Sequence, residues 1–269
     1  TLIEMVIVIV VGGIVAAMTA SILTLPINAY VDSARRATLT DVAESALRRM
    51  QRDIRSALPN SIRISADGQS LELLHIVNGG RYRAKLDVDA STGIGSGNIL
   101  DFAFNDTSFA VLGTLQNFNN INLGNDRVII YPIDVSGAKS SYKVTNSAVL
   151  AAGSDADNLI FTAKQFSLQS PQQRFFVFDD PITYRCDISS GLPKKRFLLR
   201  YQGYDIEEIQ PEPPDASEAI QANYINNCQF SYSSGSSSRA GLVTIELKLT
   251  DDAGESVRLI HQVHVDNQP

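Results

Sequence analysis

The chain has 269 residues, a formal net charge of −6 and a sequence pI of about 5.1. This acidic balance disfavours nucleic-acid binding, because proteins that bind nucleic acid present a basic patch or stripe. Hydrophobic residues make up 44% and charged residues 19%, which is typical of a globular protein.

The first stretch, TLIEMVIVIVVGGIVAAMTASILTLP, contains no charged side chain from Met5 to Leu25. About 21 residues at 1.5 Å each span about 31 Å, the thickness of the hydrocarbon core of a bilayer. The run is too long for a signal-peptide core, has no A-x-A cleavage site and does not begin with a basic flank. We therefore expect residues 1–25 to remain in the mature protein as a membrane span.

Glu4 lies at the edge of this apolar run, where a carboxylate costs several kcal/mol unless a positive charge neutralises it. One alternative is that Glu4 lies among lipid headgroups. The text Thr-Leu-Ile-Glu before a β-branched apolar run resembles the mature N-terminus of type IV pilins and type II secretion pseudopilins. Those chains usually begin Phe-Thr-Leu-Ile-Glu, whereas this sequence starts at the threonine. The resemblance implies that Glu4, together with Thr1, docks the N-terminus of an adjacent subunit.

Gly12, Gly13 and Pro26 are predicted to weaken the first helix. Pro26 has no N–H to donate to the Ile22 carbonyl, so we expect a kink or an interruption there. Helices of the pilin family carry glycine and proline in this zone and loosen locally in filaments, and the resemblance implies the same here. The alternative is a simple kink where the helix leaves the membrane.

Residues 26–57 are predicted to continue the helix as an amphipathic stem. Apolar residues recur at three- and four-residue spacing at Leu39, Ala43, Ala46, Met50, Ile54 and Leu58. The other faces carry Asp41, Glu44, Arg48, Arg49, Arg52, Asp53 and Arg55. We interpret the four arginines as a solvated face rather than an anion or lipid-headgroup site. Leu58-Pro59 should end the helix.

Residues 58–269 are predicted to form a mainly antiparallel β head with long surface loops, which makes the fold class α+β. Asn78-Gly79-Gly80 is predicted to be a hairpin turn between strands over residues 71–77 and 81–88. A second hairpin should turn at residues 251–255, and residues 218–224 should form a short helix. Loops are expected over 106–124, 136–157, 211–215 and 233–238 by composition.

Cys186 and Cys228 are the two cysteines. An even count in a domain led out of the cytoplasm by a membrane span predicts one disulfide. Closing a loop of about 43 residues would stabilise the head by roughly 4 kcal/mol in the chain-entropy model. The alternative is a pair of buried free thiols.

The sequence offers few residues in the spacing of a catalytic or metal-binding motif. His75, His261 and His264 form no ligand-spaced cluster, and the last two should point to opposite faces of a strand. Residues 87–93 have the opening spacing of a calcium loop, but the glycine falls late and the closing glutamate is missing. The sequence therefore predicts no enzyme, no cofactor, no metal site and no small-molecule substrate.

The stem text RRMQRDIRSALPNSIRI resembles minor pilins and the J-type minor pseudopilin of type II secretion. The segments ITYRCDISSGLPKKRFLLRYQGY and HQVHVDNQP further resemble minor pilins of mannose-sensitive haemagglutinin (MSHA) pili. The resemblance implies a structural subunit that assembles with other minor and major pilins through its N-terminal helix, in a tip complex that starts assembly. It also implies contact with the pilus assembly machinery, and a bacterial inner-membrane location with the head in the periplasm before export to the pilus. The alternatives are a type II secretion pseudopilin and a membrane-anchored β-domain that binds a surface ligand.

Overall fold

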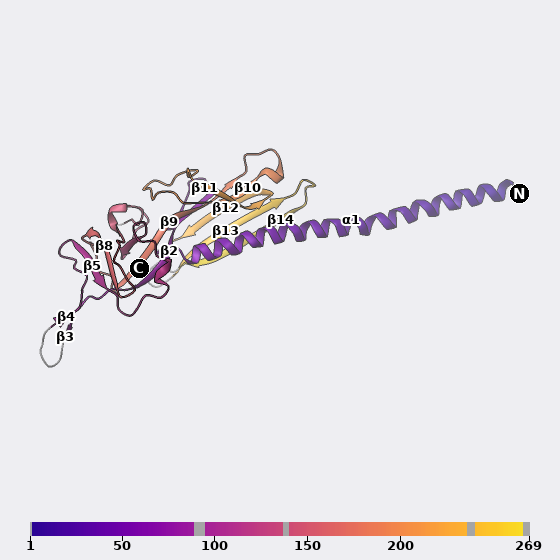
Figure 1. Ribbon diagram of the computed structural model, residues 1–269. Helices are drawn as coiled ribbons and strands as arrows, with labels where there is room; N and C mark the ends of the chain where they lie inside the picture. The colour runs from indigo at the N-terminus through magenta and orange to yellow at the C-terminus, as the bar shows by residue number, and fades with distance from the viewer. Residues whose placement is uncertain (1, 89–94, 137–139, 236–239, 266–269) are drawn as a thin grey trace.

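The computed structural model describes residues 2–88, 95–136, 140–235 and 240–265. One long helix projects from a β-rich head, with the N-terminus at its far end (Figure 1). The helix α1, Leu2–Arg55, has 54 residues and is therefore about 81 Å long at 1.5 Å per residue. The α+β class is confirmed.

The helix α1 runs through Gly12, Gly13 and Pro26 without a break. The interruption considered at Pro26 is therefore absent, and Figure 1 shows a gentle curve along the helix. A proline removes one hydrogen bond of the helical ladder, and the turns on either side keep theirs. The helix ends at Arg55, two residues before the predicted end.

The larger sheet of the head has seven strands, five of which follow the order β1-β2-β9-β10-β11. Its strands are β1 (Arg63–Ile64), β2 (Ser70–Arg81), β6 (Arg127–Ile130), β7 (Ser147–Val149), β9 (Arg174–Asp187), β10 (Phe197–Gln202) and β11 (Ser217–Asn223). Strand β6 pairs with β9 on one side and with β7 on the other. Every one of these pairings is antiparallel.

The hairpin predicted at Asn78-Gly79-Gly80 is wrong, because β2 continues through these residues and pairs with β9. A Cβ on Gly79 would lie 3.2 Å from the carbonyl oxygen of Phe175, and one on Gly80 would lie 3.0 Å from the Phe175 ring. The two glycines therefore allow close packing against β9 instead of a turn. The short helix predicted over residues 218–224 is also wrong, since β11 pairs there with β10.

A second sheet has the order β12-β13-β14. Its strands are β12 (Ile225–Ser233), β13 (Gly241–Thr250) and β14 (Ser256–Val265). The hairpin predicted at residues 251–255 is confirmed as the β13–β14 turn. The lower half of α1 lies along β13 and β14 (Figure 1), and the apolar positions predicted from its periodicity are all buried.

The remaining elements are short. They are β3 (Asp87–Val88), β4 (Gly95–Ser96), β5 (Asp106–Ala110), β8 (Asn158–Lys164) and the 3₁₀ helices η1 (Phe118–Asn120), η2 (Val144–Asn146) and η3 (Pro193–Lys195). Strands β5 and β7 lie within segments expected to be loops.

Two hydrophobic cores share the long strands β2 and β9. The first lies between α1 and the two sheets and contains Met50, Leu73 and Ile245. The second is rich in aromatic rings, with the Phe109 and Phe175 centroids 5.1 Å apart. Because β2 and β9 contribute to both cores, the head is continuous from the stem to its distal end.

Candidate functional site

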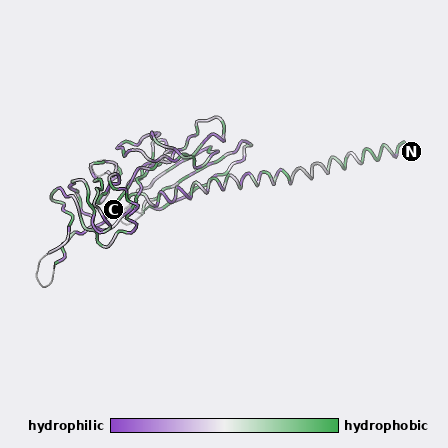
Figure 2. Tube along the Cα trace, in the orientation of Figure 1, coloured by the Kyte–Doolittle hydropathy of each residue, from purple (hydrophilic) through white to green (hydrophobic). Residues whose placement is uncertain are grey.

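The upper part of α1 is an apolar surface that the head does not cover. Within the described residues, Leu2–Thr19 is the one segment long and apolar enough to cross a membrane, with a mean hydropathy of 2.5 and none of it buried. Figure 2 shows the hydrophobic colour concentrated on this half of the helix. Such a helix supports membrane anchoring.

The apolar side chains of this upper part surround the helix instead of forming one stripe. Successive residues from Leu2 to Val11 are all exposed, with Val6 51% and Ile9 68% exposed. A helix that is apolar on every face is stable only in lipid or among other apolar helices. Gly12 and Gly13 also face open space, because a Cβ on either glycine would meet nothing within 4 Å.

Glu4 lies in the first turn of α1, and its side chain is exposed. The positive end of the helix dipole favours a carboxylate at this place. Thr1, which the sequence paired with Glu4 in docking, lies outside the described residues. The docking role of Glu4 stays a prediction.

The head first touches the helix at two arginines that the sequence did not single out. Arg36 Nε lies 2.6 Å from Glu255 Oε1, and Arg35 Nε lies 3.9 Å from Asp251 Oδ2, both in the β13–β14 turn. The hydrogen bond from Arg36 lowers the pKa of Glu255. Leu39, the first buried residue of the helix among those whose side chains are described, follows within one turn. The boundary between free stem and covered stem therefore falls near Arg35.

Asp53, which the sequence placed off the apolar face of the stem, contacts the larger sheet of the head. Its Oδ2 accepts a hydrogen bond from Arg200 Nε and another from the Tyr184 hydroxyl, both at 2.8 Å. Arg200 also donates to Gln202. Burial, and then the charge of Asp53, raise the pKa of Tyr184. The last turns of α1 are thus joined to β10 by a partly buried ion pair and to β9 by a hydrogen bond.

Arg48, Arg49, Arg52 and Arg55 are exposed, as expected of a solvated face. Arg48 pairs with Glu44 at 2.8 Å, one helical turn away. The Arg55 side chain also lines a groove of about 490 Å³ on the head.

His75 lies on β2 with its Nδ1 3.0 Å from Asp179 Oδ1 and 3.2 Å from Oδ2. The hydrogen bond that His75 donates to Asp179 raises the pKa of His75, and the charge of Asp53 acts in the same direction. His75 and Asp179 line a cavity of about 350 Å³ together with Asp180 and Arg200. No nucleophile stands within hydrogen-bond distance of His75 among the described residues, so we assign this pair no catalytic step.

Metal binding has little support in the described part of the chain, where no group of three or more His, Cys, Asp and Glu could hold an ion. Most of the calcium-like segment, residues 89–94, lies outside the described residues. The carboxylate of Asp87, at its start, pairs with Arg83. On β14 the side chain of His261 is half-buried and that of His264 is exposed, in keeping with opposite faces.

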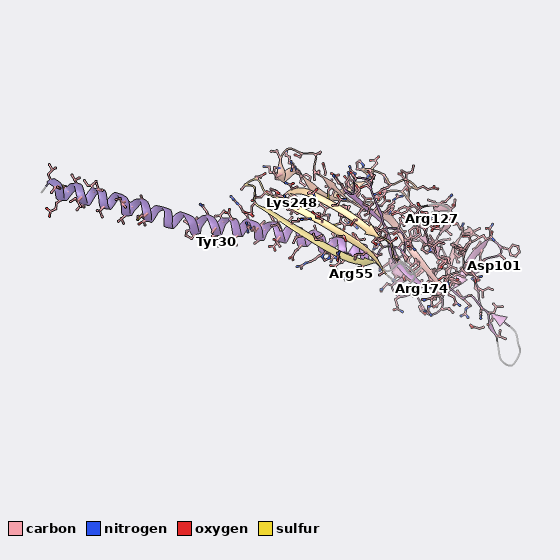
Figure 3. The ribbon with its side chains drawn as sticks, turned by 180° about the vertical axis from the view of Figure 1, so that it is seen from behind. Tyr30, Arg55, Asp101, Arg127, Arg174 and Lys248 are labelled. Carbon is pink, nitrogen blue, oxygen red and sulfur yellow. A yellow bond between two sulfur atoms is a disulfide. The ribbon has the colours of Figure 1, made fainter. Side chains whose placement is uncertain are left out.

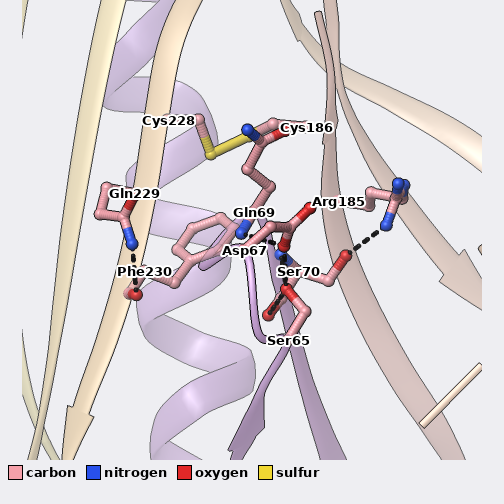
Figure 4. The surroundings of a disulfide bond; sticks show 9 residues. All are labelled: Ser65, Asp67, Gln69, Ser70, Arg185, Cys186, Cys228, Gln229 and Phe230. Carbon is pink, nitrogen blue, oxygen red and sulfur yellow. Dashed lines mark hydrogen bonds between the residues drawn. A yellow bond between two sulfur atoms is a disulfide. The ribbon is translucent and has the colours of Figure 1, made fainter. Parts of the chain in front are cut away.

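The disulfide between Cys186 and Cys228 is confirmed (Figure 4). Cys186 belongs to β9 and Cys228 to β12, and both side chains are buried in the first core. Their Cα atoms are 6.3 Å apart. The bond therefore ties the larger sheet to the smaller sheet against which the stem packs.

A buried ion pair joins Arg63 on β1 to Glu72 on β2. Arg63 donates to both carboxylate oxygens of Glu72, at 2.8 and 3.1 Å, and lies 3.6 Å from the centroid of the Tyr142 ring. Burial raises the pKa of the fully buried Glu72, while Arg63 opposes that shift. This cluster has a structural role, because each charge is satisfied within the protein.

No family model, curated protein or solved structure matches the chain.

Proposed function

We propose that this chain is a minor pilin of the MSHA type, a structural and non-catalytic subunit of a type IV pilus. Before assembly it lies in the bacterial inner membrane through the upper part of α1, with its head in the periplasm. It then joins other minor and major pilins in a complex that starts the pilus.

One observation carries this proposal: a single helix is apolar and uncovered over Leu2–Thr19 and packs one face into the head from Leu39 to its end. A simple membrane anchor needs a span and a linker, which need not be one rigid helix. A continuous helix that carries its own head transmits the position of the span to the head. Subunits whose spans pack side by side would therefore hold their heads in a fixed arrangement.

Glu4 gives the proposed assembly its register. A carboxylate among packed apolar helices has no water to solvate it, so it is stable only beside a positive charge. In the pilin family that charge is the N-terminal amine of an adjacent subunit. A misregistered neighbour would leave both charges unpaired, so the pair selects one arrangement even where its net stabilisation is small.

The variant Glu4→Val tests this role. We expect a folded, membrane-inserted protein whose incorporation into pili falls about tenfold or more, which corresponds to a loss of about 1.4 kcal/mol. Immunoblots of sheared pili and of membranes measure the two pools. Ile7→Val, a conservative change on the same exposed segment, is the control. Unchanged incorporation of Glu4→Val would overturn the docking role.

The pseudopilin alternative shares the helix and differs in the filament it serves. Deleting the gene in the native host, counting surface pili by electron microscopy and assaying secreted enzymes separate the two. Loss of pili with intact secretion supports the pilus subunit, and intact pili with failed secretion supports the pseudopilin. If neither changes, the chain is a membrane-anchored binding domain instead.

A further inference from the structure

One loop of the head carries basic side chains that the proposed function does not use. It joins β9 to β10 over residues 188–196 and contains the 3₁₀ helix η3. This basic loop has no carboxylate, and it ends in Lys194, Lys195 and Arg196. Both lysines are exposed, and the nearby Leu192 is 50% exposed.

The two lysines of the basic loop are not neutralised within the protein. Across the ranges that the structure describes, no ion pair or side-chain hydrogen bond holds Lys194 or Lys195. Arg196 differs, because its Nε donates to the carbonyl oxygen of Ser190 at 2.7 Å and closes the loop on itself. Asp187, the acid just before the loop, accepts a hydrogen bond from the loop's own backbone. The loop is therefore held in shape while its two ammonium groups stay available to a partner.

The basic loop lies at the end of the head that faces the upper part of α1. The backbone N–H of Ile225 donates to the Arg196 carbonyl. The N–H of Thr250 donates to the carbonyl of Tyr224, the residue before Ile225. Thr250 directly precedes the β13–β14 turn, which contacts α1 at Arg35. The loop and the turn therefore share one end of the head, and Figure 1 shows this end turned toward the N-terminus.

The helix places this end of the head close to the membrane surface. Tyr30 is 76% exposed and lies between the end of the apolar run at Leu25 and the first head contact at Arg35. Tyrosine is enriched at the interface between membrane and water. Figure 3 shows Tyr30 on the uncovered helix and Lys248 at the near end of the smaller sheet. Arg35 lies about 8 Å beyond Tyr30 at 1.5 Å per residue, so the head begins just outside the headgroup layer.

The carboxylates at this end do not cancel the charge of the basic loop. Asp32, Asp251 and Glu255 all form ion pairs with the two arginines at the helix boundary. In the described β13–β14 turn this leaves Asp252 as an exposed acid without an ion pair, against two lysines. The surface next to the membrane is therefore positive on the side of the basic loop.

We propose that the basic loop binds the headgroups of anionic phospholipids while the upper part of α1 spans the membrane. Lysine binds phosphate as a point charge, and basic segments beside an anionic membrane are attracted to its surface. The Leu192 side chain enters the boundary between headgroups and acyl chains. Membrane helices tilt by about 20° on average, and a tilt toward the basic loop brings that side of the head onto the headgroups.

This contact orients the head and does not anchor the chain. A short basic segment binds a membrane weakly and reversibly, and stable attachment needs a further signal, here the membrane span. The inference depends on that span and is independent of the filament that the chain serves.

The full chain in lipid nanodiscs, with a fluorophore on Gly191→Cys, tests the contact. A Cβ on Gly191 would meet nothing within 4 Å, so the label should leave the loop unchanged. Cys186 and Cys228 are bonded to each other and buried, so they do not react with the label. Quenching by a lipid with a nitroxide headgroup measures the fraction of loops at the membrane surface. We expect strong quenching in discs that contain phosphatidylglycerol and weak quenching in phosphatidylcholine alone.

Three variants in the labelled chain identify the side chains responsible. Lys194→Gln with Lys195→Gln should lower the ratio of bound to free loop about tenfold or more in phosphatidylglycerol discs. Both lysines are exposed, so the fold should be unaffected. Lys85→Gln, exposed just before β3 at the far end of the head, is the matched control and should be quenched as the unmodified chain is. Leu192→Gln should weaken the quenching that remains at high salt, where the attraction of the lysines is screened.

Equal quenching in the two lipids, or unchanged quenching in the double lysine variant, would overturn the lipid contact. Unchanged quenching of Leu192→Gln at high salt would refute entry of the leucine into the membrane. Failure of the full chain to enter discs of either lipid would refute the membrane span, and the loop contact with it. These outcomes are distinct from the result of Glu4→Val, which reports on incorporation into pili.

Discussion

Asp53 shows how one side chain joins three elements. Its carboxylate is 18% exposed and holds Arg200 on β10 and Tyr184 on β9. Asp53→Asn keeps the size of the side chain but leaves the buried Arg200 without its counter-charge. Losing one partner of a buried ion pair lowers the free energy of unfolding by about 3 to 5 kcal/mol. We expect a loss of about 3 kcal/mol here, because the Asp53 side chain remains partly exposed to solvent.

Urea unfolding in detergent, followed by far-UV circular dichroism, measures the free energy of unfolding of Asp53→Asn. The chain has no tryptophan to serve as a fluorescent probe. Asp41→Asn, exposed on the same helix, is the control and should change the free energy by no more than about 0.5 kcal/mol. Equal losses in the two variants would contradict a special role for Asp53.

His75 should make the stability of the head depend on pH. Its pKa is raised in the folded state, chiefly by Asp179, while Asp53 also raises it and Arg200 lowers it. Protonation therefore favours the folded state. The contribution of His75 to the free energy of unfolding is fully present below the unfolded pKa of about 6.5. It is lost as the pH rises through the higher folded pKa.

The free energy of unfolding of the unmodified chain, minus that of His75→Gln, should thus decrease as the pH rises from about 6.5 through the higher folded pKa. The side chains of His75 and Asp179 are 33% and 40% exposed, so the change should stay below about 1 kcal/mol. In an Asp179→Asn background the same difference should vary less with pH. A difference that grows with pH would contradict this assignment.

At the scale of elements, α1 has two halves with separate energetic roles. Met50 is fully buried in the first core, whereas Ile9 is 68% exposed. Met50→Ala leaves a cavity between the helix and the sheets and should cost about 3 kcal/mol of unfolding free energy. Ile9→Ala should leave the unfolding of the head unchanged. Urea unfolding of both variants in the same detergent checks this, and a matching loss in Ile9→Ala would show that the upper helix stabilises the head.

Sequence patterns correctly predicted those elements that depend on residues close together in the chain. The 3.6-residue period placed Leu39 and Met50 in the core, and the turn at residues 251–255 sits between two alternating strands. The hairpin turn predicted at Gly79 and Gly80 was wrong because glycine occurs both in tight turns and where strands pack closely. Their partners Phe175 and Phe176 lie about a hundred residues away, and no local pattern shows that pairing.

The candidate sites likewise separate into features that depend on neighbouring residues and features that depend on residues far apart in the chain. The uncovered apolar surface of the stem is readable from composition, and two cysteines allow one intramolecular pairing. Asp53 sits among charged residues of an amphipathic helix, and its partner Arg200 is 147 residues away. The pairing of Arg81 with Arg174 likewise appears only when β2 and β9 are in register. The sequence alone therefore does not predict which charged residues, far apart in the chain, lie next to each other in the fold.

At the scale of the whole molecule, the upper helix and the head have separate roles in membrane binding and in folding. The first core packs the lower helix against both sheets, and the Cys186–Cys228 bond fixes those sheets to each other. The second core extends the head beyond the end of the helix. The upper helix contributes to neither core among the described residues. Removing the upper helix should therefore abolish membrane binding and leave the head folded.

A chain that begins at Pro26 tests this division. Pro26 would then stand at the first turn of the helix, where a missing N–H costs little. The first contacts of the head, at Arg35 and Arg36, and the first buried residue, Leu39, all remain. We expect the same urea midpoint as the full chain and no sedimentation with phosphatidylcholine vesicles, whereas the full chain should sediment with them. Sedimentation of the shortened chain would place membrane affinity in the head, and a lower midpoint would make the upper helix part of the folding unit.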